Sequence, residues 1–360
     1  MEKNSKIYIA GHLGLVGSAI HKNLISKGYS NFIFKSFEEL DLRNQKEVLD
    51  FFKSEKPEYV ILAAAKVGGI VANNKYRADF IYENLMIQNN IIHSSYLTGV
   101  TKLLFLGSTC IYPKECPQPM HEDYLLTDIL EYTNEPYAIA KIAGIKMVES
   151  YNLQYGTNFI SVMPTNLYGP NDNFDLEKSH VLPAMIRKIH LGKCLEQNNW
   201  EQIRLDLEKR PIEEISGNSS KEEIIIILNK YGISRIGDNV QVEIWGSGKP
   251  MREFLWSEDM ADACVFLMER IDFKDVIPEN CSEIRNTHIN IGTGKEITIK
   301  ELAITIKNAV GFNGELYFNT AKPDGTMRKL TTVDKLNSLG WKHTVELDEG
   351  IDRIYKWYMS

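Results

Sequence analysis

A tyrosine and a lysine four residues apart carry the clearest chemical signal in the chain. On a helix, the spacing of Tyr137 and Lys141 would put both side chains on one face. A lysine ammonium beside a phenol favours the phenolate, so Lys141 is expected to lower the pKa of Tyr137. A tyrosine tuned in this way can pass a proton to a carbonyl oxygen while a hydride arrives at the carbon.

Ser108 makes this pair more specific than its spacing alone. The Tyr-x-x-x-Lys pattern is common by chance, but Ser108 lies upstream of it, just after the predicted strand Lys102–Leu106. Its hydroxyl could bind the same carbonyl oxygen that Tyr137 would protonate. We therefore predict that Ser108, Tyr137 and Lys141 form a catalytic group that reduces a carbonyl.

Two further side chains are ambiguous on spacing alone. Cys110 lies two residues after Ser108 and could act as a base if its pKa is lowered, although a buried structural cysteine explains the spacing better. His180 precedes the predicted helix Val181–Gly192, and a single histidine there is most simply a surface residue.

A glycine-rich turn follows the predicted first strand, Lys6–Ala10, and opens the predicted helix Leu15–Lys27. Its glycines would let the backbone approach a pyrophosphate, whose charge the helix N-terminus favours. The spacing is G-x-x-G-x-x-G rather than the usual G-x-G-x-x-G, so a purely structural turn is the alternative. Its position after the first strand favours a dinucleotide site. The residues predicted to bind the phosphates are Gly11, His12, Leu13, Gly14, Leu15, Val16 and Gly17.

The choice of cofactor is expected after the predicted second strand, Asn31–Phe34. An acidic residue there would bind the ribose hydroxyls of NAD, but this chain has Lys35 and Ser36. These side chains could hold a 2′-phosphate, which predicts NADP; a solvated surface lysine is the alternative reading of Lys35. Asp41, on the next loop, is expected to bind the adenine amino group.

Strand and helix patterns alternate through the first half, which predicts an α/β fold with a Rossmann-type doubly wound parallel sheet. Ligands of such sheets lie beyond the carboxyl ends of the strands, where the candidate residues occur. We expect residues 1–176 to form an NADP-binding Rossmann domain. Residues 177–360 should form mainly a smaller C-terminal substrate-binding lobe, with segments that return to the first domain. A charge-rich helical pair at about 195–238 reads as an insert.

Composition excludes several classes of protein. The 360 residues carry a net charge of −7, so no basic field would attract nucleic acid or an anionic membrane. The first apolar run is too short for a signal peptide, and no stretch approaches the roughly 18 apolar residues of a membrane helix. Sparse cysteines without metal-ligand spacing predict a cytoplasmic protein with no metal site. They are Cys110, Cys116, Cys194, Cys264 and Cys281.

Several motifs together resemble the GDP-L-fucose synthase family of extended short-chain dehydrogenase/reductases, over nearly the whole chain except the insert. The motifs are VILAAAKVGGIVANN at 60–74, GSTCIYPK at 107–114, NEPYAIAK at 134–141, MPTNLYGP at 163–170, SHV at 179–181, WGSG at 245–248, PMREF at 250–254 and KPDGT at 322–326.

This resemblance implies a homodimer, built through two long helices, that acts on GDP-4-keto-6-deoxymannose. A base and an acid epimerise C3 and C5 of the sugar, and NADPH then reduces C4. Cys110 and His180 match the epimerisation pair, which reverses the reading of Cys110 from spacing alone. Matches to cofactor positions are Leu106, Gly107, Lys141, Pro164, Thr165, Asn166, Leu167 and His180. Trp245, Arg252 and Lys188 match substrate positions, and Lys322 or Asp324 is expected to close the same pocket.

Three departures from the family pattern fall on its ligand-binding parts. Phe37 stands where the family usually has an arginine, Lys188 replaces a substrate arginine, and the insert takes the place of a short connection. A C4 reductase of a related sugar such as a GDP-4-keto-heptose, with little or no epimerisation, is therefore the alternative. A dehydratase is excluded because Cys110 and Ile111, rather than carboxylates, follow Thr109. A cofactor-sensing protein without catalysis is disfavoured because the Tyr137–Lys141 pair is present.

Overall fold

The computed structural model describes residues 1–277 and 282–360, so Cys281 lies outside the described residues. The chain folds as two units, each assembled from three separate stretches of sequence. The first unit contains Met1–Asn171, Glu253–Lys295 and Leu330–Glu346, and the second contains Asp172–Arg252, Glu296–Lys329 and Leu347–Ser360. The chain therefore passes between the units after Asn171, Arg252, Lys295, Lys329 and Glu346.

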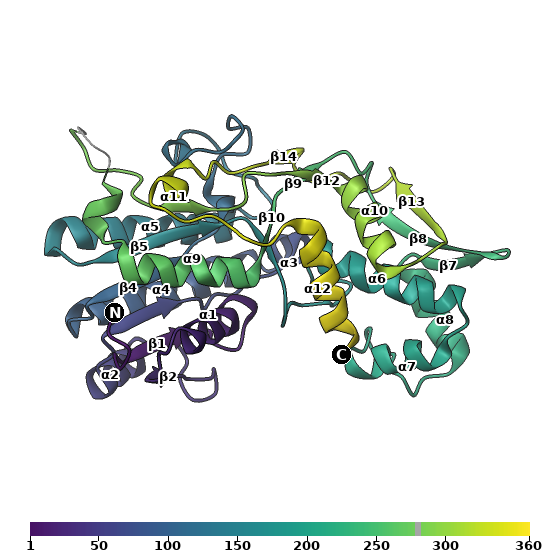
Figure 1. Ribbon diagram of the computed structural model, residues 1–360, viewed down its shortest axis with the longest axis horizontal. Helices are drawn as coiled ribbons and strands as arrows, with labels where there is room; N and C mark the ends of the chain where they lie inside the picture. The colour runs from purple at the N-terminus through teal and green to yellow at the C-terminus, as the bar shows by residue number, and fades with distance from the viewer. Residues whose placement is uncertain (278–281) are drawn as a thin grey trace. The chain divides into compact units, whose positions relative to one another are not determined.

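The first unit is built on a six-stranded sheet in the order β11-β5-β4-β3-β1-β2, and all of its pairs are parallel (Figure 1). Nearly every strand residue is buried, as expected for a parallel sheet covered on both faces. This confirms the predicted doubly wound α/β fold. The strands are β1 (Ile7–Ala10), β2 (Phe32–Ile33), β3 (Tyr59–Leu62), β4 (Lys102–Leu106), β5 (Phe159–Pro164) and β11 (Ile289–Ile291).

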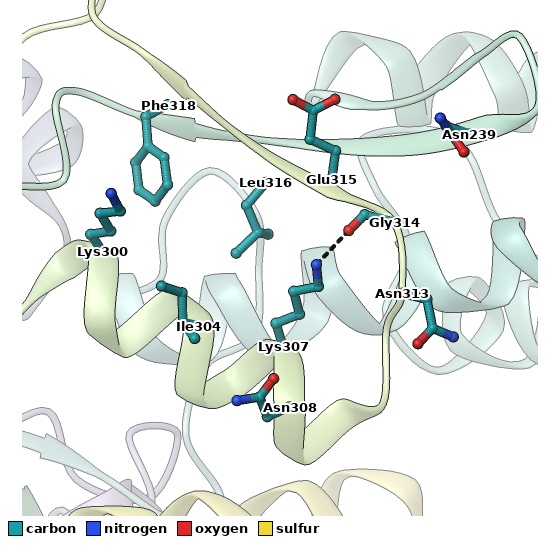
Figure 2. A pocket seen from close by; sticks show the side chains of 10 residues that line it. All are labelled: Asn239, Lys300, Ile304, Lys307, Asn308, Asn313, Gly314, Glu315, Leu316 and Phe318. Carbon is teal, nitrogen blue, oxygen red and sulfur yellow. Dashed lines mark hydrogen bonds between the residues drawn. The ribbon is translucent and has the colours of Figure 1, made fainter.

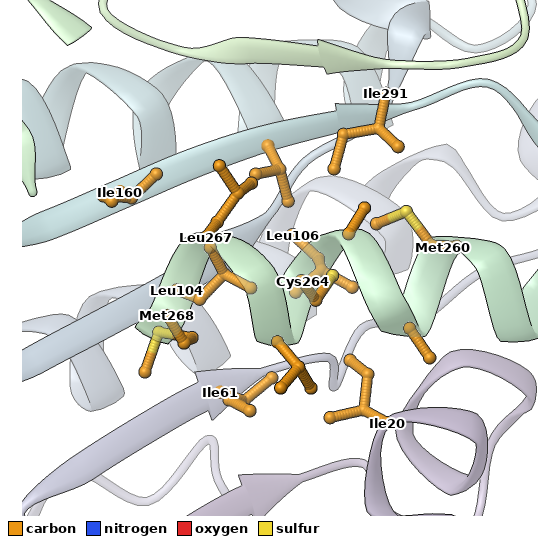
Figure 3. Packing of buried hydrophobic residues seen from close by; sticks show 14 of the residues in the cluster. Ile20, Ile61, Leu104, Leu106, Ile160, Met260, Cys264, Leu267, Met268 and Ile291 are labelled. Carbon is orange, nitrogen blue, oxygen red and sulfur yellow. The ribbon is translucent and has the colours of Figure 1, made fainter. Parts of the chain in front are cut away.

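Two hydrophobic clusters hold helices against opposite faces of this sheet. One joins the strands to α1 (Leu15–Ser26) and α9 (Ser257–Arg270), and includes Ile20, Leu104, Cys264 and Leu267 (Figure 3). The other joins the strands to α2 (Gln45–Glu55), α4 (Arg77–Leu97) and α5 (Glu135–Tyr155). Since β2 and β3 lie on opposite sides of β1, the connections leaving β1 and β2 run in opposite directions across the sheet. Such a switch point opens a crevice beyond the carboxyl ends of the strands.

The second unit contains a three-stranded sheet in the order β13-β8-β7, packed on α6 (Val181–Glu196). Helix α6 also contacts α10 (Ile299–Val310), which contacts α12 (Leu347–Met359). A second small sheet has the order β12-β9-β14. The strands are β7 (Ile233–Ile236), β8 (Asn239–Trp245), β9 (Met251–Arg252), β12 (Ile297–Thr298), β13 (Glu315–Asn319) and β14 (Arg328–Lys329).

The predicted insert forms α7 (Trp200–Lys209) and α8 (Lys221–Lys230), and its last part is strand β7, which pairs with β8. Arg187 of α6 is 1% exposed, and its Nε lies 3.0 Å from Oδ1 of Asp206 on α7. Asp206 also accepts a hydrogen bond from the hydroxyl of Tyr358 on α12. A buried ion pair with α6 and a hydrogen bond from α12 thus join the insert to two helices of the second unit.

Among the described residues, none of the helices has the length and apolar character that a membrane crossing requires.

Candidate active site

Ser108 and Cys110 lie just beyond the carboxyl end of β4. The Ser108 hydroxyl accepts a hydrogen bond from the backbone N–H of Cys110 at 3.4 Å, and so caps a 3₁₀ turn at Thr109–Ile111. The Cys110 side chain is buried, at 8% exposure. A Cβ on Gly107 would lie 2.3 Å from the end of the Met163 side chain, so that side chain would have to move if residue 107 were not a glycine.

Helix α5 brings Lys141 and Tyr137 to the same strand end. The Lys141 ammonium donates a hydrogen bond to the carbonyl of Leu106 at 2.8 Å and lies 5.6 Å from the centre of the Tyr137 ring. Helix α5 can lie this close to β4 because residue 144 is a glycine: a Cβ there would lie 2.4 Å from the Phe105 ring. Lys141 thus links the last residue of β4 to the tyrosine.

The pKa of Tyr137 differs from the sequence expectation. Burial raises its pKa well above the usual value, and the electrostatic effect of Cys110 adds to this. Burial also lowers the pKa of Lys141 to about 8, against an opposing effect of Cys110. The expected net lowering of the Tyr137 pKa was therefore wrong for this structure, because burial has the larger effect. The phenol keeps its proton at neutral pH, which suits a general acid.

The glycine turn after β1 can hold a pyrophosphate. Gly11 has φ +84°, and a Cβ there would lie 2.8 Å from the Ala64 backbone; a Cβ on Gly17 would lie 2.1 Å from the Gly11 carbonyl oxygen. At Gly14, in contrast, the nearest atom to a Cβ is that carbonyl, at 3.5 Å. Gly14 is also the N-cap of α1 and no side chain caps the helix, so its first N–H groups are available to an anion.

The segment after β2 shows a feature that the sequence reading missed. The Glu39 carboxylate accepts a hydrogen bond from the backbone N–H of Ser36 at 2.7 Å and lies 3.6 Å from the Lys35 ammonium. These contacts, first the one from Ser36, lower the pKa of Glu39. A carboxylate of the chain itself therefore binds the two groups that were predicted to hold a 2′-phosphate.

Asp41 is paired with a cation that the sequence reading also missed. Arg43 donates to both Asp41 carboxylate oxygens, with Nε at 2.9 Å and Nη2 at 2.8 Å, and lies 5.2 Å from the centre of the Phe37 ring. Arg43 thus brings a guanidinium beside Phe37, the position where the family arginine is absent. The absence of an arginine at position 37 is the feature of the sequence that could have pointed to Arg43.

The Pro164–Leu167 segment continues from β5 into the short strand β6 (Asn166–Tyr168). The backbone N–H of Thr165 donates to the Ile291 carbonyl at 3.0 Å, and the Asn166 side chain donates to the Glu253 carbonyl at 2.8 Å. Strand β6 pairs in parallel with β10 (Phe254–Trp256). The segment is therefore held on both sides at the carboxyl end of the sheet.

The predicted substrate residues, and His180, lie in the second unit. The Lys322 ammonium is 5.0 Å from the centre of the Trp245 ring, and Trp245 is 57% exposed at the end of β8. Asp324 accepts hydrogen bonds from the Ser247 backbone at 2.8 Å and from its hydroxyl at 2.7 Å. The structure thus brings together an exposed indole, a cation and a carboxylate.

Arg252 and Lys188 are each held by backbone carbonyls. The Arg252 guanidinium donates to the carbonyls of Met251 and Thr326, at 2.7 and 2.6 Å. The Lys188 ammonium donates to the Glu243 carbonyl at 2.6 Å, and burial lowers its pKa to about 8. His180 immediately precedes α6 as its N-cap residue, and its side chain makes no capping hydrogen bond.

A hollow of about 540 Å³ beside α10 and β13 contains none of the predicted residues (Figure 2). Its Lys307 ammonium is already bound to the Gly314 carbonyl at 2.6 Å. We assign it no role in the candidate site.

Comparison with known proteins gives consistent results. A model of the NAD dependent epimerase/dehydratase family matches residues 7–205 and 224–292. The putative GDP-L-fucose synthase 2 of Arabidopsis thaliana is 50% identical over 360 residues, which span 100% of this chain and 93% of the relative. The GDP-L-fucose synthase of Escherichia coli (strain K12) is 47% identical over 355 residues, or 99% of this chain and 97% of the relative.

Two solved structures from Campylobacter jejuni are similar over the whole chain. One is described as a GDP-6-OMe-4-keto-L-xylo-heptose reductase; it is 51% identical, with a TM-score of 0.92, and the match covers 100% of this chain and 99% of that one. The other, MlghC, a GDP-mannoheptose C4 reductase with NADP bound, is 50% identical, with a TM-score of 0.87 and full coverage of both chains. The family predicted from the motifs is thus confirmed. The chain belongs to the NAD dependent epimerase/dehydratase family and, within it, to the GDP-L-fucose synthase family of extended short-chain dehydrogenase/reductases.

Proposed function

We propose that this protein uses NADPH to reduce the C4 keto group of a GDP-4-keto sugar, and that it epimerises C3 and C5 before reduction. The observation that carries the reductase assignment is the link from the Leu106 carbonyl through Lys141 to Tyr137, beside the Ser108–Cys110 turn. Relatives named GDP-L-fucose synthase, about half identical over nearly the whole chain, support the substrate class.

The roles of the residues follow from their chemistry. NADPH, when bound along the Gly11–Gly17 turn, supplies the hydride to C4. Ser108 donates a hydrogen bond to the C4 oxygen, and Tyr137 gives that oxygen its phenolic proton. The Lys141 ammonium, 5.6 Å from the centre of the Tyr137 ring, offsets part of the negative charge that is then left on Tyr137. Gly14 leaves room for the cofactor. A Cβ added there would meet only the Gly11 carbonyl oxygen of the same turn, and the rest of its surroundings are open.

Epimerisation needs a different pair of groups. The protons on C3 and C5 are acidic because both carbons flank the C4 ketone. We assign Cys110 as the base that removes such a proton and His180 as the acid that returns one to the opposite face. Cys110 is buried in the turn that Ser108 caps, just beyond the carboxyl end of the strand whose last carbonyl binds Lys141.

A C4 reductase of a GDP-4-keto-heptose, without epimerisation, is the second candidate function. It is favoured by the similarity to the two Campylobacter jejuni heptose reductases and by Lys188, which keeps the charge of the family arginine but loses its paired donors. NADPH absorbance should be followed against GDP-4-keto sugars with six and with seven carbons. Turnover of a hexose supports the first function, preference for a heptose supports the second, and inactivity with both refutes the proposal.

The cofactor preference can be tested at Lys35. Lys35→Ala is expected to narrow the preference for NADPH over NADH, because one charged contact to phosphate contributes about 1.5–3 kcal/mol. Glu39→Gln should widen the preference for NADPH, because it removes the carboxylate that competes with the 2′-phosphate for Lys35 and the Ser36 N–H. Fluorescence titration gives the dissociation constants of both cofactors. Equal dissociation constants for NADPH and NADH in the wild type would refute the NADP assignment. If both variants keep the wild-type ratio of these two constants, the loop does not take part in recognition of the cofactor.

The insert is proposed to act on the sugar nucleotide. Replacing residues 197–237 with a short Gly-Ser link should raise KM for the sugar about tenfold, or about 1.4 kcal/mol, and leave KM for NADPH nearly unchanged. The reason is that Asp206 fixes Arg187, the neighbour of Lys188 on α6. Arg187→Met should accompany the excision, because an unpaired buried charge is strongly destabilising. If the excised protein keeps the wild-type kinetics for the sugar but changes its mass in solution, the insert forms a contact between subunits instead.

We also propose a cytoplasmic homodimer formed through α4 and α5. These helices pack along each other and expose apolar side chains: Leu97 at 51%, Leu153 at 51% and Tyr155 at 45%. Exposed apolar patches of this kind favour association. The cytoplasm is supported by the cysteine spacing, which is unsuited to a disulfide scaffold.

A further inference from the structure

Glu253 is a fully buried carboxylate, at 0% exposure, and it begins the second segment of the first unit. Its Oε1 accepts the backbone N–H groups of Thr293 and Gly294, at 2.6 and 2.7 Å. Its Oε2 accepts the backbone N–H of Thr331 at 3.0 Å and the Thr331 hydroxyl at 2.5 Å. Both oxygens are therefore fully used, which offsets the cost of burying the charge.

The partners of Glu253 lie where the chain passes between the two units. Glu253 follows one passage, Thr293 and Gly294 precede the passage after Lys295, and Thr331 follows the passage after Lys329. On the second unit's side, the same three segments form the small sheet β12-β9-β14, where Arg252 pairs with Ile297 and with Lys329. The three segments are thus hydrogen-bonded to one another both within the first unit and within the second, next to the points where the chain passes between the units.

Two further contacts connect Glu253 to the candidate site. Its backbone carbonyl accepts the Asn166 amide at 2.8 Å and the Thr165 hydroxyl at 3.4 Å, in the segment assigned to the cofactor. A Cβ on Gly292 would lie 2.3 Å from Oε1 of Glu253, so a glycine leaves the room that the carboxylate needs. Arg252, assigned to the sugar diphosphate, precedes Glu253 directly.

We propose that Glu253 is a positioning residue for the reduction: it holds the three segments of the first unit in one arrangement, and its carbonyl fixes the Thr165–Asn166 segment at the end of the sheet. This inference rests on the proposed function, because it is that reaction which places the cofactor against this segment. An apolar side chain could fill the same space without the desolvation cost, but it could not bind three segments at once.

Glu253→Gln is the direct test. The amide keeps one acceptor oxygen, and its NH₂ group must then face the N–H groups of either Thr293 and Gly294 or Thr331, so one segment is released. We expect kcat for the sugar to fall at least tenfold and the isotope effect with 4-deuterated NADPH to grow, because misplacement slows hydride transfer. The dissociation constant of NADPH should stay within twofold. Thr331→Val, which removes one hydroxyl donor, should change kcat in the same direction by less.

Asp262→Asn is the matched control. The Asp262 carboxylate also joins segments of the first unit, through the Trp341 indole at 2.9 Å and Lys27 at 2.9 Å, but it contacts none of the three passages. Kinetics are measured well below the melting temperature of each variant. If Glu253→Gln leaves kcat and the isotope effect at the wild-type values, or changes them no more than Asp262→Asn does, the proposal is overturned.

Amide hydrogen exchange separates this proposal from the proposed function. Peptides covering 293–298 and 328–331 should exchange at least tenfold faster in Glu253→Gln than in the wild type or Asp262→Asn. If the wild type oxidises no NADPH with any GDP-4-keto sugar, the proposed function fails, but faster exchange in the variant still shows that Glu253 holds the three segments together. Unchanged exchange in these peptides shows that it does not, whatever the activity.

Discussion

Tyr137→Phe is expected to fold and to bind NADPH normally while kcat for reduction falls by at least roughly 10²-fold, since general acid catalysis contributes about 10²–10⁴-fold. The phenyl ring should keep the edge-on packing of Tyr137 against Phe80, at 6.3 Å between ring centres. What the variant loses is the hydroxyl, whose proton the C4 oxygen must receive. Single-turnover oxidation of bound NADPH isolates this step from product release.

Two controls show whether the loss is confined to proton transfer. They are the melting temperature and the dissociation constant of NADPH, which should stay near the wild-type values because the Tyr137 ring, rather than its hydroxyl, contacts Phe80 and Lys141. A variant within threefold of the wild-type kcat would remove Tyr137 from the mechanism. Proton delivery would then have to come from a neighbouring group.

Cys110→Ser is expected to slow proton exchange at C3 and C5 of the 4-keto substrate by about 10²-fold or more. Incubation in D₂O without NADPH should place deuterium at these carbons in the wild type, because a thiolate can remove a proton that a serine hydroxyl cannot. The hydride step on a substrate that is already epimerised should remain intact, since it depends on Tyr137. Mass spectrometry of the recovered sugar measures the uptake.

This experiment decides between the two candidate functions. If the wild type takes up no deuterium but oxidises NADPH normally with an epimerised ketone, the protein is a reductase only. Cys110 and His180 would then be inherited residues in an enzyme whose substrate is epimerised elsewhere. If Cys110→Ser exchanges as fast as the wild type, the base is another residue.

The sheet of the first unit could be predicted from local patterns because parallel strands are buried on both faces and therefore appear as short apolar runs. Strands such as Lys102–Leu106 lie at the predicted residues, and α7 and α8 form the predicted helical pair within 195–238. Strands β7 and β13 were missed, since both are partly exposed and their pairing with β8 depends on distant residues. The long C-terminal helix α12 was missed although it has a strong apolar stripe, which includes Ile351, Ile354 and Tyr358.

The candidate residues were predicted better than their electrostatics. Spacing indicates that Tyr137 and Lys141 share a helix face, but it does not give the burial that raises one pKa and lowers the other. Motifs name residues that touch ligands, and so they missed Glu39 and Glu253, whose contacts are with the chain itself. Such contacts join residues far apart in sequence, as Glu253 does with Thr331.

The three separate stretches that make up the first unit affect how the protein can be synthesised. The hydrophobic face of the sheet that α9 covers is complete only when Ser257–Arg270 has been synthesised. At about 5–20 residues per second, several seconds pass between the completion of Asn171 and that of α9 on the ribosome. During that interval Leu104, Leu106 and Val162 lack part of their cover, so the nascent chain exposes an apolar sheet face to chaperones and to other chains. A fragment ending near residue 176 would keep that exposed face permanently and would be prone to aggregation.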